Sequence, residues 1–214
     1  MKRLALLLLI CLSAPLLGGW TVVSRAELAR IKGVDEGPAI SAEESLNEGI
    51  RPYAQSRAVP VLTVLEAMQG DFDQACATYG FRHSDTAFPC NFWLAVQGTI
   101  VKIDTKSQSG RAWVLPEGVT PDPKDPEAGT VILMIGPAID SMGPRDGYPG
   151  LNYDQFNDQT KFGAFGREIN RLLSSYIREK IEPLGAGSTV DAVGVLSTWD
   201  APWDTPEIVP VIFR

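Results

Sequence analysis

Two polar stretches of the chain carry side chains that could bind a ligand. The first covers residues 143–159 and mixes an arginine, carboxylates, side-chain amides and aromatic rings. Such side chains hydrogen-bond to a polar molecule and stack on its faces. The candidate contacts in this stretch are Arg145, Asp146, Tyr153, Asn157 and Gln159. The alternative is a long loop that packs on its own aromatic rings, with Arg145 and Asp146 paired for structural reasons.

The second stretch has the sequence WDAPWD and covers residues 199–204. Its candidate contacts are Trp199 and Trp203, because a tryptophan face beside carboxylates suits the C–H faces and hydroxyl groups of carbohydrates. The alternative is that one of these tryptophans fills the end of a β-barrel.

The motifs of well-known catalytic sites are missing from the sequence. Neither GxGxxG nor GxxxxGK[ST] occurs, and there is no GxSxG nucleophile elbow. His83 is the single histidine and no CxxC pair occurs, so zinc and iron sites lack ligands. Nothing singles out a catalytic pair among the 26 Asp and Glu. We therefore expect a non-enzymatic protein without a cofactor or metal.

The acidic composition argues against a nucleic-acid partner. The 214 residues include 26 Asp and Glu but 19 Lys and Arg, which gives a formal net charge of −7. No cluster of Lys and Arg follows Arg25, whereas a nucleic-acid-binding protein normally presents a basic face. Hydrophobic residues make up 44% of the chain, enough for a sizeable core. The length fits one domain, or one domain with an appended helical region.

The N-terminus predicts export from the cytoplasm. Lys2 and Arg3 precede an apolar run, and residues 4–23 carry no charge. This pattern is typical of a secretory signal, with cleavage after Gly19 or Ala26. At about 20 residues it is also long enough to span a bilayer as a helix. Residues 1–23 are thus a signal peptide or a signal anchor, and we expect a periplasmic protein, with residues 4–23 as its anchor in the second case.

Export bears on the two cysteines of the exported part, Cys76 and Cys90, which lie 14 residues apart. In an oxidising compartment we expect them to form a disulfide. The alternative is two separate buried thiols.

The elements that position these residues fall into two regions. Residues 24–80 predict an N-terminal helical region, with helices over 24–32, from Ser41 to about Arg57, from Pro60 to Gly70, and from Asp71 to Tyr79. Ser41 and Glu44 have the spacing of a capping box, and Asp71 is a helix cap.

Residues 91–214 predict strands around one long helix. Strands are expected over 92–104, 111–115, 130–135, 190–198 and 207–213, and an apolar stripe predicts a helix over 165–181. Gly98 indicates a bulge or bend in the first strand, and Pro210 marks the last as an edge strand.

The order strand, strand, strand, helix, strand, strand with a bent first strand is typical of an OB-type barrel. We therefore predict an α+β, mainly β fold: an OB-fold-like five-stranded barrel with a long helix between strands 3 and 4, preceded by an N-terminal helical layer. An open α+β sheet is the alternative.

Short motifs spread over nearly the whole chain carry a resemblance to a known family. They are TVVS at residues 21–24, Asn91-Phe92, IGPAI at residues 135–139, Arg145-Asp146, Tyr153 with Phe156-Asn157 and Gln159, and Asn170. With these motifs the chain resembles the predicted periplasmic lipoproteins of the domain family DUF2291. Members look like lipoproteins encoded beside sugar-type ABC importers. The resemblance implies an OB-like fold and an envelope-anchored accessory or ligand-binding role.

One departure from the family pattern concerns the lipid. The pattern places a lipid-bearing cysteine just before TVVS, where this chain has Trp20. A tryptophan cannot carry a thioether lipid, and Cys11 follows Leu9-Ile10 rather than the small residues of a lipobox.

These observations predict a non-enzymatic periplasmic accessory or solute-binding protein associated with a carbohydrate ABC importer. Its partners would be the binding protein or permease of that importer, or a small carbohydrate, and the membrane through the N-terminal segment. Two alternatives remain open. One is a carbohydrate-active enzyme that uses carboxylates near Asp146, Asp154 or Asp200, and the other is a purely structural envelope protein.

Overall fold

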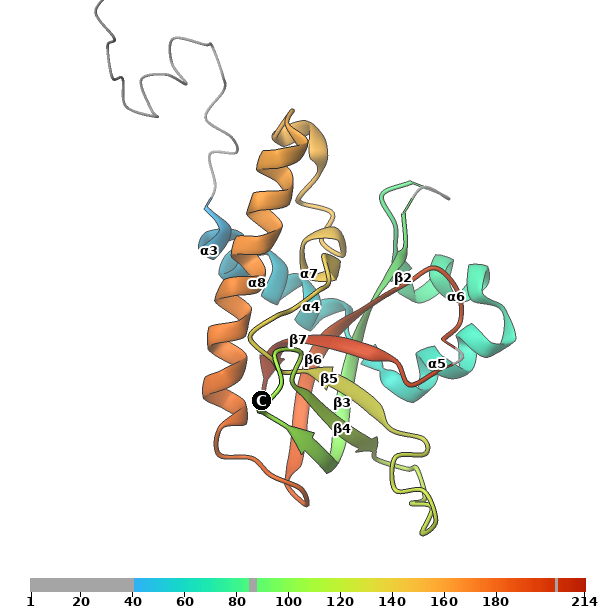
Figure 1. Ribbon diagram of the computed structural model, residues 1–214. Helices are drawn as coiled ribbons and strands as arrows, with labels where there is room; N and C mark the ends of the chain where they lie inside the picture. Colours follow the sequence, from blue (N-terminus) through green and yellow to red (C-terminus); the bar gives the residue numbers. More distant parts are fainter. Residues whose placement is uncertain (1–40, 85–87, 203) are drawn as a thin grey trace, which may run out of the picture. The chain divides into compact units, whose positions relative to one another are not determined.

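The computed structural model describes residues 41–84, 88–202 and 204–214 (Figure 1). All of them belong to one compact unit, Gly37–Arg214. The predictions for residues 1–23, for the helix over 24–32 and for Trp203 lie outside the described residues.

Two of the described helical segments begin at the caps that the sequence predicts. The Ser41 hydroxyl accepts a hydrogen bond from the Glu44 backbone N–H at 3.1 Å, and the Asp71 carboxylate accepts one from the Gln74 N–H at 3.0 Å. Each cap satisfies an N–H group that the first helical turn leaves without a partner. The elements are α3 (Ala42–Glu44), the π-helix η1 (Ser45–Ile50), α4 (Arg51–Arg57), α5 (Val61–Gly70) and α6 (Phe72–Tyr79).

Five strands close into a ring. Around it they follow the order β3 (Cys90–Asp104), β4 (Arg111–Pro116), β5 (Val131–Met134), β7 (Glu207–Phe213) and β6 (Thr189–Thr198), and β6 pairs back to β3. The pairs are antiparallel except for β5 with β7, which run parallel. This closed ring confirms the predicted OB-like barrel and excludes the open sheet. Two short strands, β1 (Val59–Pro60) and β2 (Gly80–Phe81), pair with the first half of β3.

β3 serves both halves of the barrel. Residues 90–99 pair with β6, whereas residues 98–104 pair with β4. The register shifts between Ile100 and Lys102, so Val101 is the extra residue. Of the two alternatives predicted for Gly98, a bulge or a bend, the bulge is therefore wrong. Gly98 lies where β4 joins the ladder, and a Cβ there would collide with the Leu115 carbonyl. Glycine at this position lets the backbones of β3 and β4 approach each other closely.

β7 is not an edge strand, so the interpretation of Pro210 is also wrong. β6 pairs along one side of β7, and β5 pairs with Glu207 and Ile208 on the other. Pro210 lies beyond the pairing with β5. It faces Gly194, next to an irregularity in the ladder with β6, where a missing N–H is tolerated.

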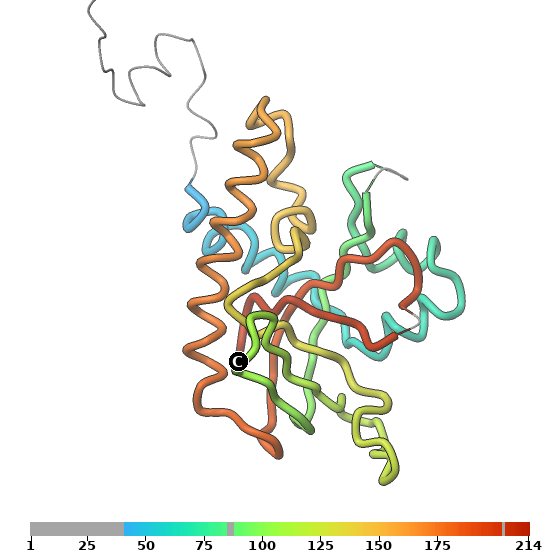
Figure 2. The backbone as a smooth tube through the Cα atoms, in the orientation of Figure 1, coloured from blue at the N-terminus to red at the C-terminus, as the bar shows by residue number. Residues whose placement is uncertain are grey.

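The long helix α8 (Gln159–Ile181) joins β5 to β6 in the chain and runs along one side of the barrel (Figures 1 and 2). Its buried residues include Ile169, Leu173, Ile177 and Ile181, which are four residues apart and form one face. The helix begins six residues before the predicted start because Asp158 caps it, accepting hydrogen bonds from the N–H groups of Thr160 and Lys161.

A disulfide joins Cys76 of α6 to Cys90 of β3, as predicted. It attaches the end of the helical region to the first strand of the barrel. Between β5 and α8 the chain forms two further short helices, α7 (Gly143–Asp146) and η2 (Tyr153–Gln155).

Candidate functional site

A groove of about 700 Å³ contains four of the seven predicted contact residues. It lies between α7, η2, the first turns of α8 and the segment around β2 and β3. Its apolar lining comes from Phe88, Met142, Tyr153 and Phe162, and its polar lining from His83, Arg145, Asp146, Asn152, Asp154 and Gln159. The volume is that of a small-molecule site.

Arg145 and Asp146 are paired to each other at the floor of this groove. The Arg145 Nε donates to Asp146 Oδ1 at 2.6 Å, and Nη2 donates to Oδ2 at 3.0 Å. Nη1 donates to the Phe162 carbonyl at 3.0 Å, and the guanidinium lies over the Phe162 ring at 3.6 Å from its centroid. The pair therefore ties α7 to α8. Of the five guanidinium N–H groups, two have no partner among the described residues.

Side chains from β3 and α8 fix the α7 segment. The buried Trp93 Nε1 of β3 donates to the Gly147 carbonyl at 2.9 Å, and the Asn91 amide donates to the Asp146 carbonyl at 3.4 Å. From α8, the Asn170 amide donates to the Ser141 carbonyl at 2.8 Å. Gly166 of α8 has no side chain to hold Met142 and Arg145 away. These contacts give the groove a rigid floor.

Three of the motif positions quoted for the family resemblance, Asn91, Asp146 and Asn170, take part in fixing this segment. The resemblance thus includes residues that position the groove as well as Tyr153 and Gln159, which line it.

Tyr153 and Phe88 are the exposed large aromatic side chains of the groove. Tyr153 is 47% exposed, and its ring meets Phe162 edge-on with centroids 6.0 Å apart. A reciprocal capping box holds the η2 turn: the Asn152 side chain accepts from the Gln155 N–H, and the Gln155 side chain accepts from the Asn152 N–H. Buried Phe156 packs against Phe162 with centroids 5.1 Å apart. The loop does pack on its own aromatic rings, yet Tyr153 remains free to contact a ligand.

Asn157 and Trp199 do not line the groove, and Trp203 lies outside the described residues. Asn157 adopts a left-handed backbone conformation, with φ of 49°, which asparagine tolerates at a turn. Trp199 is 62% exposed in the loop between β6 and β7. Asp200 and Asp204 of that loop line a separate cavity of about 270 Å³. The two predicted stretches therefore border different cavities.

Sequence reasoning missed the wall formed by His83 and Phe88. Both residues lie in the connection between β2 and β3, and the pairing of Gly80 with Phe92 brings that connection to the groove. A two-residue strand gives almost no signal in a sequence. Within the described residues, no three His, Cys, Asp or Glu side chains are grouped so that they could hold a metal ion.

A comparison with models of known protein families identifies the family of this chain. The family model described as "Predicted periplasmic lipoprotein (DUF2291)" matches residues 9–214. The chain belongs to the DUF2291 family. The match confirms the resemblance and assigns this DUF2291 chain to a group described as periplasmic lipoproteins. None of the helices formed by the described residues is long and apolar enough to cross a membrane.

A solved structure supports the fold of the DUF2291 chain. An OB-fold protein from Thermotoga maritima superposes with a TM-score of 0.54 at 15% sequence identity, over 77% of this chain and 97% of the other. At this identity the likeness shows the fold alone. No curated protein matches the DUF2291 chain.

Proposed function

We propose that this DUF2291 protein is a non-enzymatic periplasmic binding protein that takes a small carbohydrate in the groove beside α7 and assists a carbohydrate ABC importer. The observation that carries the proposal is the lining of the groove. An exposed tyrosine ring, Tyr153, and an exposed phenylalanine ring, Phe88, share one cavity with carboxylate and amide side chains.

This lining matches the two surfaces of a sugar. The pyranose ring presents C–H groups that pack on aromatic rings, and its hydroxyl groups donate to carboxylates and exchange hydrogen bonds with amides. Asp154, Asn152 and Gln159 supply such groups in the lining of the same groove. The groove volume of about 700 Å³ is ample for a monosaccharide or disaccharide.

The charges of the lining favour a neutral ligand. Arg145 is neutralised by Asp146 in a bidentate pair, and Asp154 adds one further negative charge. An anionic ligand would therefore meet net repulsion, whereas a neutral sugar would use the carboxylates as hydrogen-bond acceptors.

Calorimetric titration of the full-length protein with monosaccharides and disaccharides tests the groove. Tyr153→Ala should weaken binding of a responding sugar about tenfold, since stacking on one ring contributes on the order of 1 kcal/mol or more. Trp199→Ala is the matched control, because it removes an exposed aromatic ring outside the groove. A loss caused by Trp199→Ala alone would move the site to the other loop and overturn the proposal. Turnover of the sugar would support the enzyme alternative instead.

The importer part of the proposal is supported by the resemblance, which implies a position beside sugar-type ABC importers. Affinity capture from membranes should recover a permease or binding protein, and deletion should lower uptake of the sugar that binds. Capture without a transporter component, together with unchanged uptake, would contradict the importer part of the proposal. It would not bear on sugar binding in the groove.

We further propose that residues 4–23 hold the protein in the inner membrane as a helix. Trp20 stands where the family pattern has its lipid-bearing cysteine, so a different tether is needed if the protein stays on the membrane. Mass spectrometry of the mature protein should find the chain starting at Met1. A start at Trp20 or Glu27 would contradict the anchor.

A further inference from the structure

Three arginines of α8 form a stripe away from the carbohydrate groove. Arg167, Arg171 and Arg178 are four and seven residues apart. At 3.6 residues per turn, their directions around the helix axis agree within about 40°. The sequence shows no basic run here, but the helix places the three arginine positions on one face of a protein with a net charge of −7.

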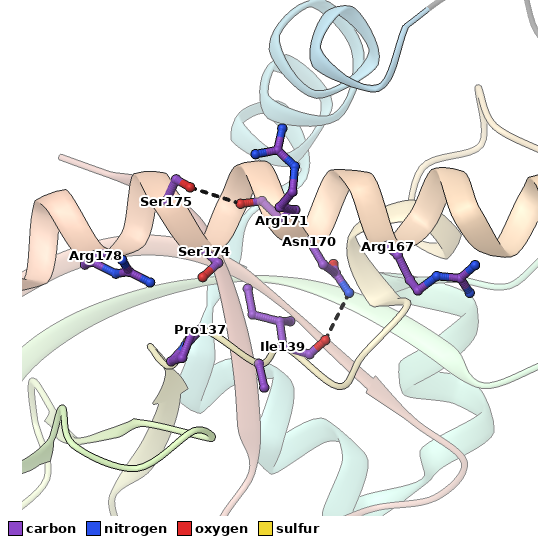
Figure 3. A pocket seen from close by; sticks show the side chains of 9 residues that line it. Pro137, Ile139, Arg167, Asn170, Arg171, Ser174, Ser175 and Arg178 are labelled. Atoms are coloured by element: carbon purple, nitrogen blue, oxygen red, sulfur yellow. Dashed lines mark hydrogen bonds between the residues drawn. The ribbon is translucent and has the colours of Figure 1, made fainter.

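The stripe borders its own groove, of about 360 Å³ (Figure 3). The opposite wall is the segment of residues 137–139. Asn170 fixes that wall, because its amide donates to the Ile139 carbonyl at 3.2 Å and to the Ser141 carbonyl at 2.8 Å. Figure 3 shows Arg178 and Ser174 on the side of α8 that faces Pro137, whereas Arg171 points away.

Two of the three arginines form no ion pair with the residues that the structure describes. Arg171 is held by Glu168, whose carboxylate accepts from Nε at 2.8 Å and from Nη2 at 2.7 Å. These hydrogen bonds lower the pKa of the Glu168 carboxyl. Arg167 and Arg178 are exposed and make no ion pair or side-chain hydrogen bond within the part of the chain that the structure describes. In the same part of the chain, the nearly buried Ser174 hydroxyl also has no hydrogen-bond partner.

We infer that this groove binds a phosphate group, carried by an anionic lipid headgroup or by a soluble phosphate ester. Arg178 supplies a planar pair of donors that matches two phosphate oxygens, and Ser174 supplies a hydroxyl donor one turn away. Arg167 adds a second free charge at the other end of the groove. A phosphate monoester would offer this lining three acceptor oxygens and a charge near −2, whereas a phosphodiester headgroup would offer two acceptor oxygens and a charge of −1. The inference does not rest on the proposed carbohydrate function.

Two binding measurements on the full-length protein separate the two sources of phosphate. Glycerol 3-phosphate titrated by calorimetry probes a soluble ester. Co-sedimentation with phosphatidylglycerol vesicles, compared with phosphatidylcholine vesicles, probes a lipid headgroup and corrects for any insertion of the N-terminal segment. Both are run at low ionic strength and at about 0.15 M salt, where screening weakens exposed charges beyond about 8 Å.

The variant Arg167→Gln/Arg178→Gln should weaken binding about tenfold or more, since each charge-assisted hydrogen bond contributes on the order of 1.5 kcal/mol. Lys180→Gln is the matched control: it removes a positive charge from another face of the same helix, and its binding should stay within about twofold of the wild type. Binding of either probe that is weakened in the double variant but not in Lys180→Gln supports the phosphate site. The probe that binds shows whether the phosphate belongs to a soluble ester or to a lipid. Absence of binding to both probes, or equal losses in the double variant and in Lys180→Gln, would overturn it.

Discussion

The pairing of Arg145 with Asp146 leads to a quantitative prediction. Replacing Arg145 with Met should lower the free energy of unfolding by about 2–4 kcal/mol. The substitution removes three hydrogen bonds and the contact with the Phe162 ring. It also leaves the Asp146 carboxylate largely desolvated and without its cation, because the two side chains are only 10% and 16% exposed.

The magnitude follows from burial. Breaking a fully buried ion pair costs about 3–5 kcal/mol, mainly because a charge is left without compensation. The residual exposure of this pair lowers the expected cost somewhat. Exposed pairs contribute about 0–1 kcal/mol. Arg111 and Glu207 form such a pair, at 2.7 Å with side chains 41% and 38% exposed.

Urea denaturation of the two variants is the assay. Arg145→Met and Arg111→Met remove the same side chain from ion pairs of similar length, so their difference measures the effect of burial together with the contacts of Arg145 to Phe162. We expect Arg145→Met to cost at least about 2 kcal/mol more than Arg111→Met. Arg145→Lys keeps the charge but not the bidentate geometry, so its loss of unfolding free energy should lie between those of Arg111→Met and Arg145→Met. Equal costs for the two Met variants would refute the assignment of Arg145 as the link between α7 and α8.

Three further predictions concern stability. Cys76→Ser/Cys90→Ser, which opens a loop of 14 residues, should lower the free energy of unfolding by about 3 kcal/mol in urea; an unchanged midpoint would contradict the disulfide. Gly98→Ala should cost about 2 kcal/mol or more, since its Cβ would collide with the Leu115 carbonyl; a neutral effect would refute the close approach. Hydrogen bonds from the backbone N–H groups of Lys161 and Thr160 lower the pKa of Asp158, so its stabilising effect is present above the unfolded-state pKa and is lost as the pH falls through the lower folded-state pKa. Asp158→Asn should keep the cap but flatten this acidic part of the melting-temperature profile; an unchanged profile would contradict the assignment.

Local signals carried most of the fold prediction. The caps at Ser41 and Asp71 depend on side chains within three residues of the helix start, so the sequence alone locates them. The barrel follows from the order of strands and the single long helix. The bulge could not be placed, because it depends on which residues of β4 face β3. The prediction from Pro210 failed because it also depends on strand pairing. A proline is tolerated in a paired strand where the ladder is already irregular.

The sequence predicted residues of the candidate site that come from the segment 145–159, but not those between β2 and β3. Arg145, Asp146, Tyr153 and Gln159 lie within 15 residues, and their types alone indicated binding. The sequence could not decide whether the arginine faces a ligand or its neighbour, since that depends on burial. The wall from His83 and Phe88 depends on strand pairing. The groove beside the arginines of α8 depends on where residues 137–139 lie, which the sequence does not show.

Binding of a sugar at the groove is the most direct test of the central claim. Full-length wild-type protein, Tyr153→Ala and Trp199→Ala should be titrated with the same panel of monosaccharides and disaccharides. The account predicts that at least one neutral sugar binds to the wild type and to Trp199→Ala with similar affinity and about tenfold more weakly to Tyr153→Ala. A panel in which no sugar binds, or in which Tyr153→Ala binds as well as the wild type, would contradict it.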